Sequence, residues 1–328
     1  MQFIQIPQQY APLGQAIRYA VEQDAAGNLD ARIVEVNSEV LLGAKRFAET
    51  TAAAFDIAPM LRRTLRFTPS TGATGFQTAV ERCITVRVEA LETGSEAIAA
   101  TAPARTFLPG DEIPAAPCIR TTMPLERLIP EGAADELTLW SDEACVVTVS
   151  GHSADSVTAE SYRSESAGLQ IFRLDTRDFP ACETLTVDAG ECGVVRYTVI
   201  PATQEAVRMA WRSRCGSIEH YSFPVVRSTT LRVSRQRAET ADGHLVTAVE
   251  ADRETELVSA YEIPEVLKTL AGIVTAPQVW RVDGEAYTPV DVVTEEAVVQ
   301  QRGVLRALEL VVRPQNSSYV YDPSRPHR

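Results

Sequence analysis

Regular alternation of apolar and polar residues is the feature that most constrains this sequence. Residues 83–90 read C-I-T-V-R-V-E-A, so Ile84, Val86 and Val88 point to one side and the residues between them to the other. A period of two is the period of a β-strand with one buried face. Similar patterns predict strands at 17–22, 31–37, 137–140, 144–149, 194–200, 229–235, 244–251, 255–261 and 304–312. The chain is therefore predicted to be mainly β.

Turn signals join these strands into hairpins. Asp283-Gly284 stands between two strand patterns, and this dipeptide suits a type I′ turn, whose two central residues need positive φ. The tripeptide A-D-G at 241–243 predicts a second hairpin, and A-A-G-N at 25–28 predicts a third. Many short strands without regular intervening helices favour β-sandwich modules over α/β units.

Two short helices interrupt the strand patterns. Residues 264–275 carry an apolar stripe at helical spacing, with Pro264 in the first turn and Pro277 beyond the end. Residues 57–65 are the second predicted helix, and Asp56 is placed to cap its first turn.

The chain is long enough for two or three domains, because it has 328 residues and domains of about 100–200 residues are common. Four prolines between 102 and 118 exclude a central strand there, so this stretch is predicted to be a linker. The predicted fold is a series of tandem β-sandwich-like modules. They comprise an N-terminal β module at 1–101, a Pro-rich linker at 102–118, a middle β-sandwich-like module at 119–203, a C-terminal β module with a short helix at 204–315 and an extended tail at 316–328.

Charge argues against a nucleic-acid partner. The chain carries 44 acidic and 31 basic residues, a net charge of −13, whereas phosphate binding depends on basic surface. The arginine-rich stretch at 208–214 is interpreted as the exposed face of a strand. No apolar run approaches the ~20 residues of a membrane span, so no membrane insertion is predicted. Residues 1–10 lack the features of a signal peptide, which predicts synthesis in the cytoplasm.

The sequence predicts no catalytic or metal-binding motif. G-H-S-A-D at 151–155 resembles a nucleophile elbow, but Asp155 stands where that turn needs a small residue, and no helix pattern follows. No catalytic residue, metal site or cofactor is therefore predicted, and a hydrolase built around Ser153 is only the third hypothesis. Cys182 and Cys192 flank a hairpin-like segment, and the sequence leaves their pairing open.

An aromatic cluster is the one candidate binding site. Trp211, His220, Tyr221 and Phe223 lie close together in the sequence. Exposed rings in such a cluster bind sugars, whereas buried rings would simply be part of a core. A carbohydrate- or receptor-binding adhesin module, with a host surface glycan or receptor as partner, is the alternative function.

Three segments resemble tail and baseplate structural proteins from phages and prophages of gut anaerobes. They are an opening hairpin followed by F-D-I-A-P-M-L at 55–61, the segment 210–223, and the helix at 264–275 with the hairpin and final strand after it. The second is similar to that group's W-x-N-x-x-G-x-x-x-x-Y-x-F segment, with Arg212-Ser213-Arg214 where an asparagine is expected. Residues 119–201 match no segment of the group.

The resemblance implies a setting and carries no site residues. It implies a non-enzymatic structural component of a virion, made in the host cytoplasm. Its expected partners are other tail proteins and further copies of itself, as a homo-oligomer. This is the first functional hypothesis from the sequence.

Overall fold

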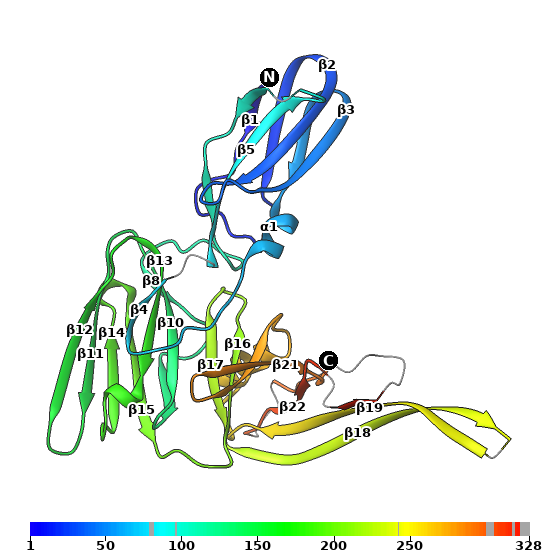
Figure 1. Cartoon of the computed structure of the whole chain (residues 1–328). Coiled ribbons are helices and arrows are strands. Elements are labelled where there is room, and N and C mark those ends of the chain that lie inside the picture. Colours follow the sequence, from blue (N-terminus) through cyan, green and yellow to red (C-terminus); the bar gives the residue numbers. More distant parts are fainter. Residues whose placement is uncertain (79–81, 96, 242, 300–304, 317–318, 322–328) are drawn as a thin grey trace.

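The computed structural model describes residues 1–78, 82–95, 97–241, 243–299, 305–316 and 319–321. Three β modules follow one another along the chain, and a long hairpin projects from the third (Figure 1). The mainly β fold, with sandwich-like modules and two short helices, is confirmed.

The N-terminal module is one six-stranded sheet, and its core continues into the C-terminal module through Ala210, Ile218 and Trp280. Alternate residues such as Tyr19, Ile33 and Val86 point inward and are fully buried. The strands are β1 (Gln2–Gln5), β2 (Arg18–Glu35), β3 (Leu41–Asp56), β5 (Ile84–Glu92), β6 (Ile98–Thr101) and β7 (Arg105–Phe107).

The predicted turn at 25–28 is wrong. Strand β2 runs through it without reversing and stays paired with β3, with register shifts between Glu22 and Gly27 and again between Gly27 and Leu29. The small residues of A-A-G-N thus accompany an irregular ladder instead of a hairpin, because bulges bend a strand without ending it. The side-chain amide of Gln23 donates to the carbonyl of Gly27 at 3.0 Å within this irregular stretch.

Helix α1 (Ala58–Thr64) follows β3, where the sequence predicts a helix. The Asp56 carboxylate accepts hydrogen bonds from the backbone N–H groups of Ala58 and Ile17, at 2.9 and 2.8 Å. Beyond α1 the chain leaves the N-terminal module, and β4 (Gly75–Gln77) pairs with a strand of the middle module. The chain then returns to the N-terminal module at β5. We call residues 66–78 the excursion.

The stretch 102–118 contributes strands to two different modules. Strand β7 pairs with β5 in the N-terminal sheet, and β8 (Cys118–Arg120) pairs with β10 in the middle module. Between them, Pro109 and Gly110 pack against the C-terminal module, where a Cβ added to Gly216 would lie 2.5 Å from Pro109 Cβ. Gly216 also has a φ of +80°, so glycine is required there on two grounds.

The middle module is a sandwich of two sheets, ordered β4-β13-β10-β8 and β12-β11-β14-β15-β9. Leu139 and Phe172 from the first sheet meet Val149 and Val187 from the second in a shared core. Its remaining strands are β9 (Glu126–Pro130), β10 (Ala134–Ser141), β11 (Val146–His152), β12 (Val157–Arg163), β13 (Gly168–Asp175), β14 (Thr184–Asp188) and β15 (Val194–Ile200).

The C-terminal module is an eight-stranded sheet ordered β17-β16-β20-β21-β22-β19-β18, with β23 also paired to β19. Helix α2 (Pro264–Leu270) and the 3-10 turn after it (Ala271–Ile273) pack Leu267 and Leu270 against Trp211 in the core. The strands are β16 (Val207–Arg212), β17 (Ile218–Phe223), β18 (Val225–Thr240), β19 (Gly243–Val258), β20 (Val279–Asp283), β21 (Ala286–Val292), β22 (Glu309–Pro314) and β23 (Tyr319–Tyr321).

The hairpin predicted at Asp283-Gly284 is present, but its turn type differs. Asp283 pairs with Ala286, so the two loop residues are Gly284 and Glu285. Of these, only Gly284 has positive φ, at 60°. A glycine with positive φ at the first central position is typical of a type II′ turn, which matches the twist of paired strands as well as type I′ does.

Candidate functional site

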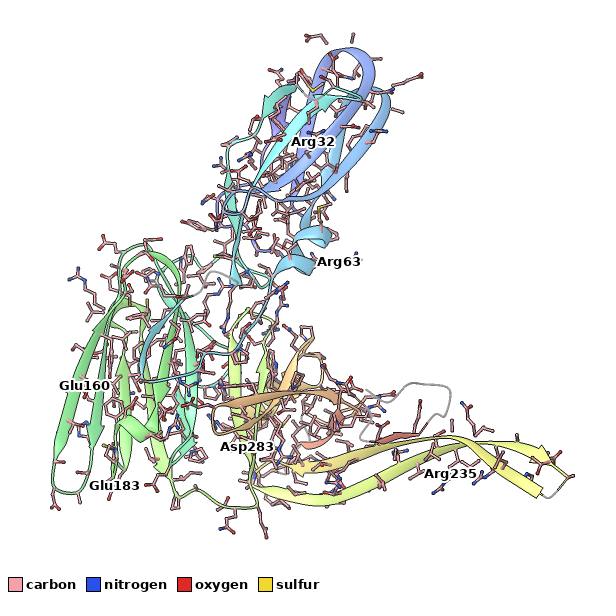
Figure 2. All side chains as sticks on the ribbon, in the orientation of Figure 1. Arg32, Arg63, Glu160, Glu183, Arg235 and Asp283 are labelled. Atoms are coloured by element: carbon pink, nitrogen blue, oxygen red, sulfur yellow. The ribbon has the colours of Figure 1, made fainter. Side chains whose placement is uncertain are left out.

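A two-stranded arm is the most unusual feature of the molecule. It consists of β18 and β19, each of 16 residues, joined at the pair Thr240–Gly243. At about 3.3 Å per residue, strands of this length span roughly 50 Å. Figure 1 shows the arm extending away from all three modules, and Figure 2 shows its side chains, among them Arg235, standing clear of the body.

The arm has little support from the rest of the chain. At its base, Thr255–Val258 pair with β22, and about halfway along the arm Val249–Ala251 pair with β23. Within the described residues, no strand pairs with the outer edge of β18. An isolated two-stranded ribbon is at best marginally stable in water, and a long unpaired edge is a template for another chain.

One face of the arm carries exposed aliphatic side chains. Leu231 and Val233 alternate on this face of β18 and are 60% and 40% exposed. Their cross-strand neighbours on β19 are Arg253 and Ala251. The opposite face is polar near its base, where Arg232 Nε lies 2.5 Å from Glu254 Oε2. We call the side that bears Leu231 and Val233 the apolar face.

The arm's outer strand differs in charge from the rest of the protein. Strand β18 contains four arginines and one glutamate, a net charge of +3, whereas the whole chain carries −13. Arg235 and Arg237 lie in the outer half of the arm, away from the body. Strand β19, which pairs with it, carries four acidic residues and one arginine, so the charge of β18 is balanced within the arm.

A buried ion pair joins the N-terminal module to the middle module. Arg82, just before β5, and Glu136 on β10 are each only 2% exposed and form a two-fold ion pair. The pair is anchored further by the excursion, because Glu136 accepts from the Ser70 N–H at 3.1 Å and Arg82 donates to the Thr68 carbonyl at 2.8 Å.

A second cluster joins the middle and C-terminal modules. Asp135 on β10 forms an ion pair with Arg208 on β16 and lies 3.6 Å from Arg127. Burial alone would raise the pKa of Asp135, but the positive charges, Arg208 foremost, outweigh it and hold the pKa below its usual value. His220 Nδ1 lies 4.0 Å from Asp135 Oδ1, and burial lowers the pKa of His220 to about 4, so the imidazole is neutral at pH 7.

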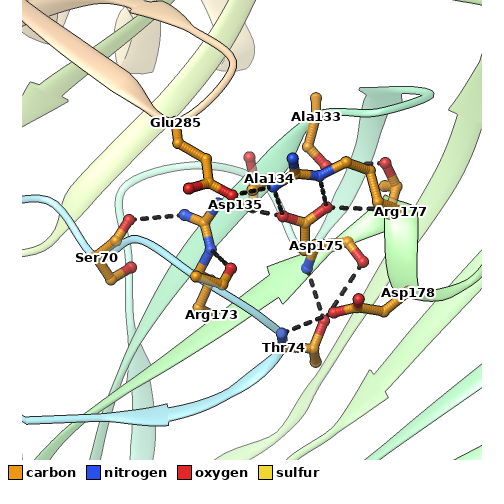
Figure 3. Close-up of polar contacts among 12 residues, drawn as sticks. Ser70, Thr74, Ala133, Ala134, Asp135, Arg173, Asp175, Arg177, Asp178 and Glu285 are labelled. Atoms are coloured by element: carbon orange, nitrogen blue, oxygen red, sulfur yellow. Dashed lines mark hydrogen bonds and ion pairs between the residues drawn. The ribbon is translucent and has the colours of Figure 1, made fainter.

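Figure 3 shows a third cluster, in which charges alternate from the excursion to the C-terminal module. Arg173 donates to the carbonyls of Ser70 and Gly72, both at 2.7 Å. Arg177 bridges Asp175 and Glu285, with Nη2–oxygen distances of 2.6 and 2.7 Å. Arg173 and Asp175 are buried and paired, whereas Arg177 and Glu285 are about half exposed, and together these contacts connect the excursion, the middle module and the C-terminal module.

The aromatic cluster predicted from the sequence is divided between two faces of the C-terminal sheet. Trp211 and Phe223 are buried in the core beneath α2, where Tyr221 packs on Phe223 with ring centroids 5.1 Å apart. His220 points to the other face and hydrogen-bonds to the Tyr287 hydroxyl at 3.1 Å. Trp211, His220 and Phe223 are thus buried, and they form no exposed surface on which a sugar could stack.

Ser153 lies in the turn between β11 and β12. Its hydroxyl is hydrogen-bonded to Ser156, with an Oγ–Oγ distance of 2.8 Å, as expected of a polar hairpin turn.

All six cysteines are free thiols, and Cys192 Sγ lies 3.3 Å from the carbonyl of Trp140 rather than against Cys182. Among the described residues, no three His, Cys, Asp or Glu side chains are grouped to hold a metal ion. In the same part of the chain, no helix has the length and apolar character to cross a membrane.

The sequence matches no protein-family model and no curated protein. Among solved structures, Dpr2 Ig1-Ig2 in complex with DIP-Theta Ig1-Ig3 is similar at 8% identity and a TM-score of 0.21, over 95% of this chain and 88% of that one. A bacterial ice-binding adhesin is similar at 9% identity and a TM-score of 0.18, over 79% of this chain and 90% of that one. Escherichia coli alpha-2-macroglobulin is similar at 9% identity and a TM-score of 0.21, over 90% of this chain and 24% of that one. TM-scores this low carry no argument about this chain.

Proposed function

We propose that this protein is a non-enzymatic structural subunit of a multi-subunit assembly, of the kind that builds phage tails and baseplates, and that its arm binds a second copy of the same chain. The observation that carries the proposal is the arm itself. It has two strands of 16 residues, an unpaired outer edge and aliphatic side chains in solvent. A ribbon of this kind gains stability when another chain covers its apolar face.

The rigid body supports the same proposal. Two buried ion pairs, Arg82–Glu136 and Arg208–Asp135, and the half-exposed pair Arg177–Glu285 join the three modules, so the base of the arm has a defined direction relative to the body. A subunit whose contact surfaces are preorganised loses less conformational entropy on assembly than one with mobile modules. The exposed side chains of Arg235 and Arg237 on the outer strand of an acidic chain favour a second copy as the partner. The setting in a virion rests on the sequence resemblance alone.

Replacing Leu231 and Val233 together with threonine tests the proposal. Threonine retains β propensity and charge but removes the apolar contact. We expect the wild-type chain to self-associate, and the double variant L231T/V233T to lose about 2 kcal/mol of association free energy, more than tenfold in Kd. Sedimentation velocity over a range of protein concentrations measures both.

Leu245→Thr is the matched control. Leu245 is as exposed as Leu231, at 58%, but its pairing with Ala238 places it on the opposite face of the arm. This variant should associate like the wild type. A wild-type chain that stays monomeric at the highest concentration, or a control that weakens association as much as L231T/V233T, contradicts the proposal.

A further inference from the structure

A cleft of about 830 Å³ lies where the N-terminal module, the joint after β7 and the C-terminal module meet. Arg62 from α1 and Asp111 from the joint form part of one side. Trp211 to Arg214 and the residues from Lys268 to Pro277 form the other. A volume of this size is within the usual range for a small-molecule site, roughly 300–1,000 Å³.

Three cationic side chains in this cleft lack an acidic partner among the described residues. They are Arg212 and Arg214, at and just after the end of β16, and Lys268 on α2. The other arginine of the same stretch, Arg208, differs because it forms an ion pair with Asp135. The cleft therefore collects positive charge on a chain whose net charge is −13.

Arg212 is held in place for such a role. Its guanidinium carbon lies 3.8 Å from the centre of the Phe67 ring, a cation–π contact that fixes the group without neutralising it. Burial and the nearby charge of Arg82 lower the pKa of Arg212, so an added negative charge would stabilise the guanidinium. Arg62 differs, because it already donates to the carbonyls of Leu13, Gly14 and Gln15.

The wall of the cleft is also shaped by a glycine. A Cβ added to Gly272 would lie 3.9 Å from the indole nitrogen of Trp211, a buried donor without an acceptor in the described structure. Gly272 and Trp211 both line the cleft, so the unpartnered indole N–H lies in its wall.

We infer that this cleft binds a small multivalent anion, a ligand with two or more phosphate or carboxylate groups, through Arg212, Arg214 and Lys268. Planar guanidinium groups bind phosphate and carboxylate oxygens in a two-fold manner, and the lysine ammonium adds a point charge. The cleft is separate from the arm, so anion binding does not depend on the arm's contact with a second copy.

Isothermal titration calorimetry at low ionic strength tests it, with tripolyphosphate as the phosphate probe and citrate as the carboxylate probe. We expect at least one of the two to bind at one site per chain. The variant R214Q/K268Q should weaken that binding by roughly tenfold or more. Binding to tripolyphosphate alone identifies phosphate as the recognised group, and binding to citrate alone identifies carboxylate.

The control R235Q/R237Q removes the same charge from the arm, far from the cleft. It should leave the affinity within about twofold of the wild type, since charges beyond a Debye length are largely screened. The inference is overturned if neither probe binds the wild-type protein. It is overturned equally if R235Q/R237Q weakens binding as much as R214Q/K268Q, because the effect would then report net charge alone.

Discussion

Replacing Arg82 with alanine should cost about 3–5 kcal/mol of unfolding free energy, more than almost any other single change in the chain. The variant leaves Glu136 buried at 2% exposure with its ion pair removed. A lone buried carboxylate must either stay charged in a poorly solvating site or take up a proton, and both are unfavourable. Urea denaturation followed by circular dichroism measures the loss.

Two comparisons separate this effect from a general loss of charge. Arg46→Ala removes the exposed partner of Asp30, whose ion pair is 69% exposed on the arginine side, and should cost far less stability than Arg82→Ala because water screens this pair. The double variant R82M/E136Q should recover much of the lost stability, because it removes both charges and retains an acceptor for the Ser70 N–H. An Arg82→Ala variant as stable as Arg46→Ala would show that this junction does not hold the modules.

Unfolding free energy should fall by about 2 kcal/mol between pH 7 and pH 5, and by about 3 kcal/mol by pH 4, because of His220 alone. Burial lowers the pKa of this imidazole from 6.5 to about 4 in the folded protein. Between those two pH values the imidazole of His220 binds a proton in the unfolded chain but stays neutral in the folded chain. The stability is therefore fully present above pH 6.5 and is lost as the pH falls toward 4.

The variant His220→Gln should flatten this dependence between pH 7 and pH 5, whatever its stability at pH 7. His152, which is exposed at the end of β11, is the matched control, and His152→Gln should retain the wild-type slope. Urea denaturation at a series of pH values gives both slopes. Equal slopes for wild type and His220→Gln would mean that Asp135, 4.0 Å away, stabilises the charged imidazole enough to cancel the effect of burial.

Local patterns in the sequence predicted much of the fold, because they are set by neighbouring residues. The alternation at 83–90 became β5, and the proline-bounded stripe at 264–275 became α2 with its 3-10 turn. The A-A-G-N segment was misread because glycine and small residues accompany bulges as well as turns. Only the pairing partner of β2 decides between the two.

Features of the candidate sites depend on contacts between distant residues. Arg82 and Glu136 are 54 positions apart, and Gly72 and Arg173 meet only because β4 of the excursion joins the middle sheet. The sequence contains only a weak indication of the arm. Residues 225–258 show the alternation of two strands on either side of A-D-G, but few large apolar residues lie on either face. That composition is typical of a two-stranded ribbon without a core of its own. The strands predicted at 229–235 and 244–251 are shorter than β18 and β19 and did not indicate a projecting arm.

Hydrogen exchange of the β18 backbone, measured as a function of protein concentration, tests most directly whether the arm binds a second copy. Outward-facing amides of an unpaired edge exchange quickly, and a partner seated on the arm shields them. We predict that peptides from 225–240 exchange more slowly as concentration rises in the wild type. Peptides from β12, an edge strand of the middle module, should not change. Exchange of 225–240 that is the same at every concentration, or the same in wild type and L231T/V233T, would contradict the account.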